Sequence, residues 1–216
     1  MRIHIIAGSP NSENINAGII PAEQPDLIIA ADGGAERCRR LGIIPHILIG
    51  DLDSISAELT EEYRHAGVEI IRHPCRKDAT DLELALDLAR ARGAQEAVLF
   101  GVLGGRWDMS IANVMVAAGK KYQRMRVSLL DTQCRIYIIH GGSTFTLKSV
   151  PGQTVSLIPL TADAEGVTTD GFDYPLKESL LPFSTSRGIS NKLIKKEGKI
   201  TVKKGLLLCI ENLSLC

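Results

Sequence analysis

The sequence predicts an α/β N-terminal domain with a mainly parallel sheet, followed by an all-β, sandwich-like C-terminal domain. Through about residue 130, short apolar or β-branched runs alternate with polar helical segments, as in a parallel sheet covered on both faces. From Cys134 onward, short strands follow one another between Gly, Pro and Asp turns, with no convincing amphipathic helix. We therefore expect an α/β domain at residues 1–131 and a β domain at residues 132–216.

The predicted elements of the first domain alternate regularly. We expect strands at residues 2–7, 27–31, 47–49, 68–71, 97–103 and 126–130, and helices at residues 34–41, 56–66 and 110–120. A further helix begins after Thr80 and ends near Gly93. Its apolar residues follow the i, i+3, i+4, i+7 spacing of one buried helix face, at Leu82, Ala85, Leu86 and Ala89.

The second domain is predicted to consist of strands and turns. Strands are expected at residues 136–139, 143–148, 154–159 and 164–168, and the chain should end in a hairpin. In that hairpin Ile200 and Val202 alternate with polar residues, and Gly198 supplies the preceding turn. The polar segment 184–191 is an ordinary surface loop unless a function requires it.

Composition excludes several classes of function. The 216 residues are 44% hydrophobic and 23% charged, which is ordinary for a soluble globular protein. Because 25 basic residues balance 25 acidic ones, no global charge favours nucleic acid or an anionic membrane. No stretch approaches membrane-spanning length and no signal-peptide pattern opens the chain, so we expect a cytoplasmic protein. The five cysteines form no Cys-x-x-Cys pair, which predicts reduced thiols.

An acidic motif follows the predicted strand at residues 47–49. Asp51 and Asp53 come directly after Gly50, where the carboxyl end of a parallel strand meets the ligand crevice. Mg²⁺ is usually held by one or two carboxylates together with substrate phosphates. The alternative is a plain strand-to-helix loop whose Asp residues cap a helix.

Two further segments carry groups suited to phosphate. Thr80 and Glu83 have the spacing of a capping box, in which each side chain binds the other residue's amide, so they serve as caps before they serve as ligands. Lys77, Asp78 and Asp81 are not explained by capping alone, and they lie where the helix dipole favours phosphate.

A glycine pair, Gly104 and Gly105, stands between a strand and a helix and is followed by Arg106, which can bind phosphate in a bidentate manner. The spacing matches neither a Walker A loop nor a dinucleotide fingerprint. Trp107 is expected in the core or an interface rather than under a ligand.

Taken in order, five stretches resemble the thiamin pyrophosphokinase family over nearly the whole chain. They are Asp32-Gly33-Gly34-Ala35, Gly50-Asp51-Leu52-Asp53-Ser54, Lys77-Asp78-Ala79-Thr80-Asp81-Leu82-Glu83, Gly104-Gly105-Arg106-Trp107-Asp108 and Gly188-Ile189-Ser190-Asn191. The resemblance implies a homodimer with active sites between subunits. It also implies Mg²⁺-dependent transfer of diphosphate from ATP to thiamin, giving thiamin diphosphate and AMP.

The same resemblance assigns roles by position. Asp51, Asp53 and Asp81 would hold Mg²⁺, and Ser190 and Asn191 would seat thiamin. The nucleotide would be bound by a larger set of residues, namely Asp32, Gly33, Lys77, Asp78, Thr80, Gly104, Gly105 and Arg106. Either Asp81 or Asp108 would assist deprotonation of the substrate hydroxyl, and the sequence does not choose between them.

Two departures from the family pattern bear on substrate choice. Met109 stands where the family usually has His after Asp108, so a polar role at that position is absent. The first loop reads Ala7-Gly8-Ser9-Pro10 instead of the usual glycine-rich form. The alternatives are a diphosphokinase for another hydroxyalkyl heterocycle such as a pterin, and a catalytically silent thiamin-binding protein.

Overall fold

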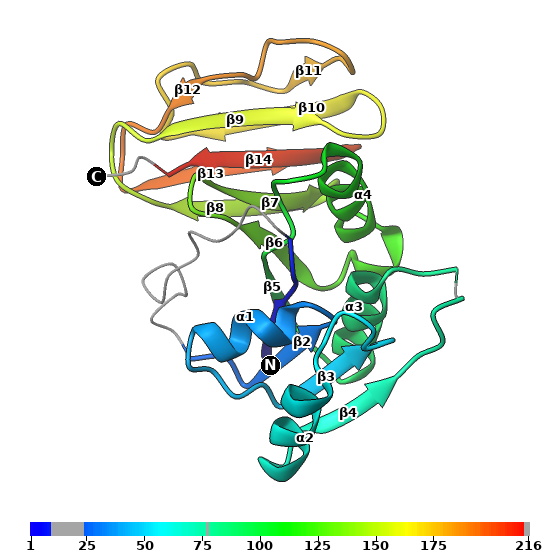
Figure 1. Ribbon diagram of the computed structural model, residues 1–216. Helices are drawn as coiled ribbons and strands as arrows, with labels where there is room; N and C mark the ends of the chain where they lie inside the picture. Colours follow the sequence, from blue (N-terminus) through cyan, green and yellow to red (C-terminus); the bar gives the residue numbers. More distant parts are fainter. Residues whose placement is uncertain (10–23, 77, 214–216) are drawn as a thin grey trace. The chain divides into compact units, whose positions relative to one another are not determined.

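The computed structural model describes residues 1–9, 24–76 and 78–213 (Figure 1). Lys77, which the sequence assigns to phosphate binding, lies outside the described residues. The chain divides into two compact units, Met1–Thr132 and Gln133–Cys216. Each has a hydrophobic core of its own.

The first unit contains a parallel sheet, as predicted. Its strands are β1 (Arg2–Ile6), β2 (Leu27–Ala31), β3 (Ile47–Gly50), β4 (Glu69–Arg72), β5 (Glu96–Phe100) and β6 (Arg126–Leu130). They pair in the order β6-β5-β1-β2-β3-β4, and every pair is parallel. Consecutive residues of β1 from Ile3 to Ile6 are at most 2% exposed, so both faces of the sheet are covered.

The strand order creates a switch point beside β1. From β1 the chain builds β2, β3 and β4 toward one edge, then returns to add β5 on the other side of β1 and β6 beyond it. Connections leaving the carboxyl ends of β1 and β5 therefore run in opposite directions. Open α/β sheets bind ligands in the crevice outside such a point.

The helices of this unit are α1 (Gly34–Arg40), α2 (Ala57–His65), α3 (Asp81–Ala91) and α4 (Trp107–Ala117), with a 3₁₀ turn η1 (Lys120–Tyr122). Helix α3 buries the four residues that the sequence predicts, Leu82, Ala85, Leu86 and Ala89. The Thr80 hydroxyl caps α3 by accepting a hydrogen bond from the Glu83 amide at 3.3 Å.

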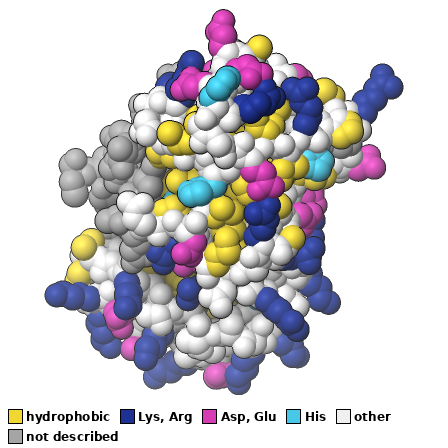
Figure 2. All heavy atoms as spheres, turned by 90° about the horizontal axis from the view of Figure 1, so that it is seen from below, with side chains coloured by type: hydrophobic (Ala, Val, Ile, Leu, Met, Phe, Trp, Pro, Cys, Tyr) yellow, Lys and Arg dark blue, Asp and Glu magenta, His cyan; other side chains and the backbone are white. Residues whose placement is uncertain are grey.

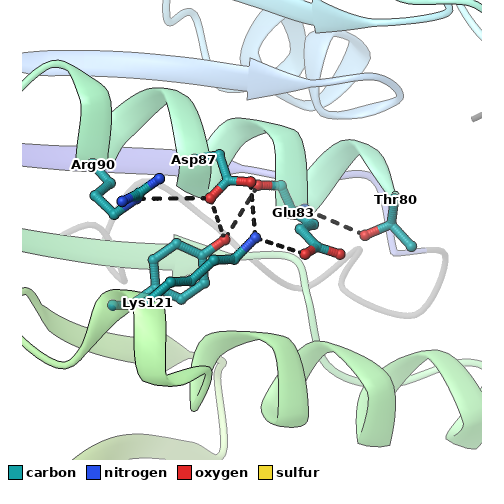
Figure 3. A network of polar contacts seen from close by, with 6 residues as sticks. Thr80, Glu83, Asp87, Arg90 and Lys121 are labelled. Carbon is teal, nitrogen blue, oxygen red and sulfur yellow. Dashed lines mark hydrogen bonds and ion pairs between the residues drawn. The ribbon is translucent and has the colours of Figure 1, made fainter. Parts of the chain in front are cut away.

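The other half of the predicted capping box is wrong. The Glu83 carboxylate accepts a hydrogen bond from Lys121 at 2.7 Å, and the same ammonium group binds Asp87 at 2.8 Å (Figure 3). A lysine that arrives from η1 offers Glu83 a charged partner, which is a stronger attraction than the Thr80 amide. This network fixes η1 against the exposed side of α3.

Two predicted boundaries also shift. The strand expected at residues 97–103 ends at Phe100, because Gly101 takes a left-handed conformation (φ +66°) that ends the extended run. The helix expected at residues 110–120 begins earlier, at Trp107, and ends at Ala117. Arg106 is the extended residue that precedes it.

The second unit is a pair of β-sheets, as predicted. Its strands are β7 (Cys134–His140), β8 (Ser143–Lys148), β9 (Thr154–Pro159), β10 (Ala164–Asp170), β11 (Ser179–Leu181), β12 (Asn191–Lys192), β13 (Glu197–Val202) and β14 (Leu206–Asn212). Within the unit they are ordered β12-β9-β14-β7 in one sheet and β11-β10-β13-β8 in the other. Between them lies a core that includes Leu147, Val155, Val167 and Leu207.

The predicted final hairpin is wrong. Strand β13 pairs with β8 and β10, whereas β14 pairs with β7 and β9 in the other sheet. Gly198 lies inside β13 rather than in a turn. A Cβ atom there would come within 2.6 Å of Phe172 and Leu193, so the glycine makes room for the core.

The surface agrees with the balanced charge of the chain. On the face seen from below in Figure 2, acidic and basic side chains lie near one another around exposed hydrophobic ones. None of the helices in the described ranges is long and apolar enough to cross a membrane. Cys38 and Cys209 are buried free thiols.

Candidate active site

A cavity of about 530 Å³ opens at the carboxyl ends of the parallel strands in the first unit. The loop after β1 contributes Gly8 and Ser9 to its lining. The other contributors are the loops after β2, β3 and β5 and the first turns of α3 and α4, with Asp32, Gly33, Asp51, Thr80, Asp81, Gly104, Arg106 and Met109 among the lining residues. The cavity therefore occupies the switch point between β1 and β5.

An acidic cluster lies beside this cavity, and three of its members, Asp32, Asp51 and Asp81, line it. The carboxylates of Asp51 and Asp53 and the Cys75 thiol have ligand atoms within 4.8 Å of one another. Asp32 and Asp81 approach from neighbouring segments: a Cβ on Gly50 would lie 3.1 Å from the Asp32 Cβ and 3.2 Å from Asp81 Oδ1. Gly50 has no side chain, and this absence allows the four acids to converge.

The backbone around the cluster is strained. Asp32 and Leu52 both have positive φ, at +44° and +65°, and Gly50 has φ +153°. Such conformations are costly for residues with side chains and gather at binding and catalytic sites. Here they turn the chain so that Asp51 and Asp53 follow β3 without extending it.

The carboxylates of the cluster influence one another's ionisation. A hydrogen bond shared with Asp51, followed by repulsion from Asp51, Asp32 and Asp81, raises the pKa of Asp53. Asp32 Oδ2 accepts a hydrogen bond from Ser54 at 2.7 Å. Its Oδ1 is buried and has no hydrogen-bond partner among the residues that the structure describes. Converging carboxylate oxygens in this state fit a hard divalent cation such as Mg²⁺.

The alternative interpretation of Asp51 and Asp53 as helix caps is wrong. Helix α2 is capped by Ser56, whose hydroxyl accepts from the Leu59 amide at 3.1 Å. Asp51 Oδ1 accepts a local hydrogen bond from the Asp53 amide at 3.3 Å, within the turn that precedes the helix. The two carboxylates are therefore not used to begin the helix.

Glycines allow the loops around the cavity to approach closely. A Cβ on Gly8 would lie 2.7 Å from the carbonyl carbon of Gly33, so the loop after β1 rests on the loop after β2. Gly104 and Gly105 both have positive φ, at +85° and +67°. Gly33 and Gly104 line the cavity, whereas Gly105 does not.

Arg106 lies at the rim and is paired with Asp108. Its guanidinium donates to both carboxylate oxygens of Asp108, at 3.1 Å from Nε and 2.5 Å from Nη2. This pair lowers the pKa of Asp108, which makes that carboxylate a weaker proton acceptor. Asp108, Asp53 and Asp78 do not line the cavity, whereas Asp81 does.

Helix α4 fixes the loop after β5, and sequence reasoning missed the residues that do so. Asn113 donates from Nδ2 to the Val102 carbonyl at 2.8 Å, and the Ser110 hydroxyl donates to the carbonyls of Gly104 and Arg106. Ser110 and Asn113 are buried polar residues three positions apart in a helix whose residues after Asp108 are otherwise apolar, which is the signal that would have identified them.

Of the two positions predicted for Trp107, the core is wrong, because its side chain is 82% exposed. A place in an interface stays a prediction. Ile111 and Met115 follow Trp107 at helical spacing and are 56% and 60% exposed. Together these three residues form an apolar stripe along α4, which we call the α4 stripe. Met109, on the same helix, faces the cavity.

In the second unit, the segment from Gly188 to Asn191 is held against β9. The Leu157 amide donates to the Gly188 carbonyl at 2.8 Å, and the Ser190 amide donates to the Ser156 hydroxyl at 3.0 Å. Ser190 has φ +59°, a conformation that this anchoring maintains. Its side chain is exposed, and its hydroxyl has no hydrogen bond with another described residue.

The side-chain amide of Asn191, unlike the Ser190 hydroxyl, already makes hydrogen bonds within the fold. Its Oδ1 accepts from the amides of Tyr174 (3.0 Å) and Lys192 (2.8 Å), and its Nδ2 donates to the Tyr174 carbonyl at 2.8 Å. Asn191 therefore ties the loop around Tyr174 to β12. Of the two residues predicted to seat thiamin, Ser190 has the available hydroxyl.

Comparison with known families assigns both units. Residues 22–129 match the catalytic domain of thiamin pyrophosphokinase, and residues 143–207 match the vitamin B1 binding domain of the same family. A thiamine pyrophosphokinase of Bacillus subtilis is 30% identical over 97% of this chain and 98% of its own length. Thiamine pyrophosphokinase 1 of Oryza sativa is 27% identical over 89% of this chain and 71% of its own length.

Solved structures agree with these sequence matches. A crystal structure of thiamine pyrophosphokinase from Bacillus subtilis superposes with a TM-score of 0.86 at 29% identity, covering both chains completely. The thiamin pyrophosphokinase of Geobacillus thermodenitrificans gives a TM-score of 0.82 at 28% identity, over 100% of this chain and 99% of that one. The fold, the two matched domains and the full-length relative give one assignment: the chain belongs to the thiamin pyrophosphokinase family.

Proposed function

We propose that this protein transfers a diphosphate group from ATP to thiamin, giving thiamin diphosphate and AMP. The observation that carries the proposal is the convergence of Asp32, Asp51, Asp53 and Asp81 at the switch-point cavity of a chain that belongs to this family. The earlier alternatives of a pterin diphosphokinase or a silent binding protein have no comparable support.

The nucleotide is proposed to lie in the cavity of the first unit. The glycine loops at Gly33 and Gly104 allow phosphates to come close to the backbone, and Thr80 begins α3, whose amino end favours anions. Arg106 supplies a permanent positive charge at the rim. Asp78 and Gly105 are exposed and do not line the cavity. They therefore have less support as nucleotide contacts than the predicted residues that do line it.

Asp51, Asp53 and Asp81 are proposed to hold Mg²⁺, as converging carboxylates with a raised pKa at Asp53 support. When bound there, the metal supplies positive charge to the phosphates and orients them for in-line transfer. Asp32 is proposed to support this site through its buried carboxylate oxygen Oδ1, which has no hydrogen-bond partner among the described residues.

The reaction follows from these positions. The hydroxyl oxygen of thiamin attacks the β-phosphorus of ATP, the bond between that phosphorus and the oxygen bridging to the α-phosphate breaks, and AMP leaves with that oxygen. The hydroxyl proton passes to a carboxylate. Of the two candidates from the sequence, Asp81 lines the cavity, while Asp108 is held by Arg106 and is the weaker acceptor.

The thiamin site and the assembly belong to the same proposal. Ser190 is proposed to bind thiamin through its hydroxyl, and Asn191 to hold the loop that presents it. The α4 stripe is proposed as part of a homodimer interface, since a contiguous exposed apolar helix face favours association. Active sites would then lie between subunits. A cytoplasmic location stays a prediction from the sequence.

Acceptor dependence tests the proposal. Purified protein with Mg·ATP is incubated with thiamin, with a hydroxymethyl pterin, or with no acceptor, and AMP is quantified. We expect AMP in proportion to added thiamin and none without acceptor. AMP formed only with the pterin would contradict the acceptor assignment, and AMP formed without any acceptor would indicate a nucleotide hydrolase.

A further inference from the structure

A buried arginine lies behind the cavity of the first unit. Arg37, in α1, is only 4% exposed, although arginine is rarely buried without a charged partner. No ion pair among the described residues includes it, and its Nη2 donates to the Ser9 carbonyl at 2.7 Å. Its Nη1 is buried without a hydrogen-bond partner in the described part of the chain.

The charge on this group persists despite its burial. Desolvation, followed by repulsion from Arg40, lowers the pKa of Arg37, and attraction from Asp131 acts in the opposite direction. A guanidinium starts from so high a pKa that it stays protonated in proteins. The fold therefore keeps a positive charge in a poorly solvated place, where charge interactions are stronger than in water.

Gly101 separates this charge from the cavity. A Cβ on Gly101 would lie 1.7 Å from Arg37 Nη1 and 2.3 Å from the Ala7 carbonyl oxygen, so the glycine leaves the space that the guanidinium fills. Gly101 also lines the cavity. The guanidinium consequently lies directly behind the cavity wall, with no side chain at Gly101 in between.

The same arginine joins the two loops of the switch point. Arg37 donates a hydrogen bond to the Ser9 carbonyl. The amide of the same residue, Ser9, donates to the Gly101 carbonyl at 3.0 Å. The Ser9 hydroxyl donates in turn to the Gly104 carbonyl at 3.1 Å. Arg37 is thus connected through Ser9 to the glycine segment that the proposed function gives to phosphate.

We propose that Arg37 is a positioning residue for the polyphosphate of the nucleotide: it holds the Ser9 and Gly101 segments together and places a permanent positive charge behind the cavity wall. A bound polyphosphate would add negative charge on the side of Nη1, which has no hydrogen-bond partner among the described residues. This inference rests on the proposed ATP-binding function of the cavity.

Binding measurements on two variants test this role. Arg37→Lys keeps the charge and loses the planar fork, whereas Arg37→Gln keeps a polar side chain and loses the charge. Affinity is measured by calorimetry for AMP and for Mg·α,β-methylene-ATP, in which the bond to be broken cannot react. Arg40→Gln is the matched control, because Arg40 is exposed on the same helix. Thermal melting monitors the fold.

We expect Arg37→Gln to lose about tenfold in affinity for the triphosphate analogue and Arg37→Lys about threefold, with AMP affinity changed by less than about twofold in both. The control should bind like the wild type. Equal losses for AMP and the triphosphate, or equal losses in the two variants, would overturn the inference, since a purely structural role predicts them. If Arg37→Gln does not fold, the selective loss in Arg37→Lys decides.

The same binding measurements distinguish a failure of the proposed function from a failure of the role assigned to Arg37. If the wild-type protein itself does not bind the triphosphate analogue, the cavity is not an ATP site, and the inference falls with it. If the wild type binds and Arg37→Lys binds the analogue equally well, only the role of Arg37 is overturned.

Discussion

Individual residues at the candidate site adopt unfavourable conformations and charge states. Four carboxylates converge around Gly50, and Asp32 and Leu52 adopt positive φ to bring them there. A hydrogen bond shared with Asp51, followed by repulsion from the neighbouring carboxylates, raises the pKa of Asp53. Stability is thereby reduced in the metal-free protein at a place where metal and phosphate are proposed to bind.

Asp53→Asn should therefore separate activity from stability. We expect turnover to fall by about a hundredfold or more, because a proposed metal ligand loses its charge. The metal-free variant should melt slightly above the wild type at neutral pH. A folded-state pKa above the unfolded one means that ionised Asp53 destabilises the fold, and that this penalty disappears as pH falls through the folded pKa.

The measurements are product formation and thermal melting from neutral to acidic pH, with Asp173→Asn as the control at an exposed acid in the other unit. The melting difference should shrink toward low pH. Full activity, or a difference that does not depend on pH, would contradict this account of the cluster.

Ser190→Ala should affect thiamin and not ATP. Loss of one hydrogen bond from an available hydroxyl is expected to raise the KM for thiamin by about five- to tenfold while the KM for ATP stays the same. Ser184→Ala is a matched control, because Ser184 is also exposed and has the same φ of +59°. Steady-state kinetics with each substrate varied in turn checks this, and equal rises in both KM values would remove Ser190 from the acceptor site.

At the scale of elements, helix α4 organises the cavity wall more than its apolar sequence suggests. Asn113 is 7% exposed, and its side chain supports the Val102 carbonyl in the loop that leads to Gly104 and Arg106. We expect Asn113→Ala to cost about 1–3 kcal/mol, since it leaves a buried carbonyl without its donor. For a chain of this size each kcal/mol corresponds to about 2–4 °C in Tm.

The same substitution should also lower kcat/KM, because the loop that carries Arg106 loses its support. Calorimetric melting and kinetics of Asn113→Ala check both effects, with Gln123→Ala as a control at an exposed position after η1. A variant as stable and as active as the wild type would mean that Ser110 alone fixes the loop.

Elements were predictable where local signals decide them. The periodic apolar face of α3 and the alternation along the parallel strands were read correctly from the sequence. The final hairpin was not, because Gly198 looks like a turn residue, and only contact with Phe172 and Leu193 explains why it lies in a strand. Likewise the predicted capping bond from Glu83 does not form, because its carboxylate binds Lys121, which lies 38 residues later in the sequence.

Across the whole molecule, the strand order explains why the site lies where it does. Six parallel strands were predictable, but the return of the chain to place β5 beside β1 was not, because no local signal specifies that order. That return brings the loops holding Ser9 and Gly104 together. The acids that lie together beside the cavity were proposed from their motifs, and their role in the site stays a prediction. The buried contacts of Arg37 and Asn113 were visible only in three dimensions.

The proposed assembly can be tested on the α4 stripe. We expect Ile111→Asp to shift the protein from dimer to monomer in sedimentation velocity, because a charge in an apolar interface must be desolvated. Ile44→Asp is the control, since Ile44 is an exposed isoleucine of the same unit outside the stripe. A monomeric wild type, or an Ile111→Asp variant that stays dimeric, would contradict the interface.

The central claim is transfer of one intact diphosphate, and the fate of labelled phosphates tests it most directly. Wild-type protein is given thiamin and Mg·ATP labelled in the β- and γ-phosphates, and all products are identified by mass. We predict thiamin diphosphate that carries both labels, with an equal amount of unlabelled AMP. Thiamin monophosphate with ADP, or labelled inorganic diphosphate with thiamin unchanged, would contradict the proposed reaction.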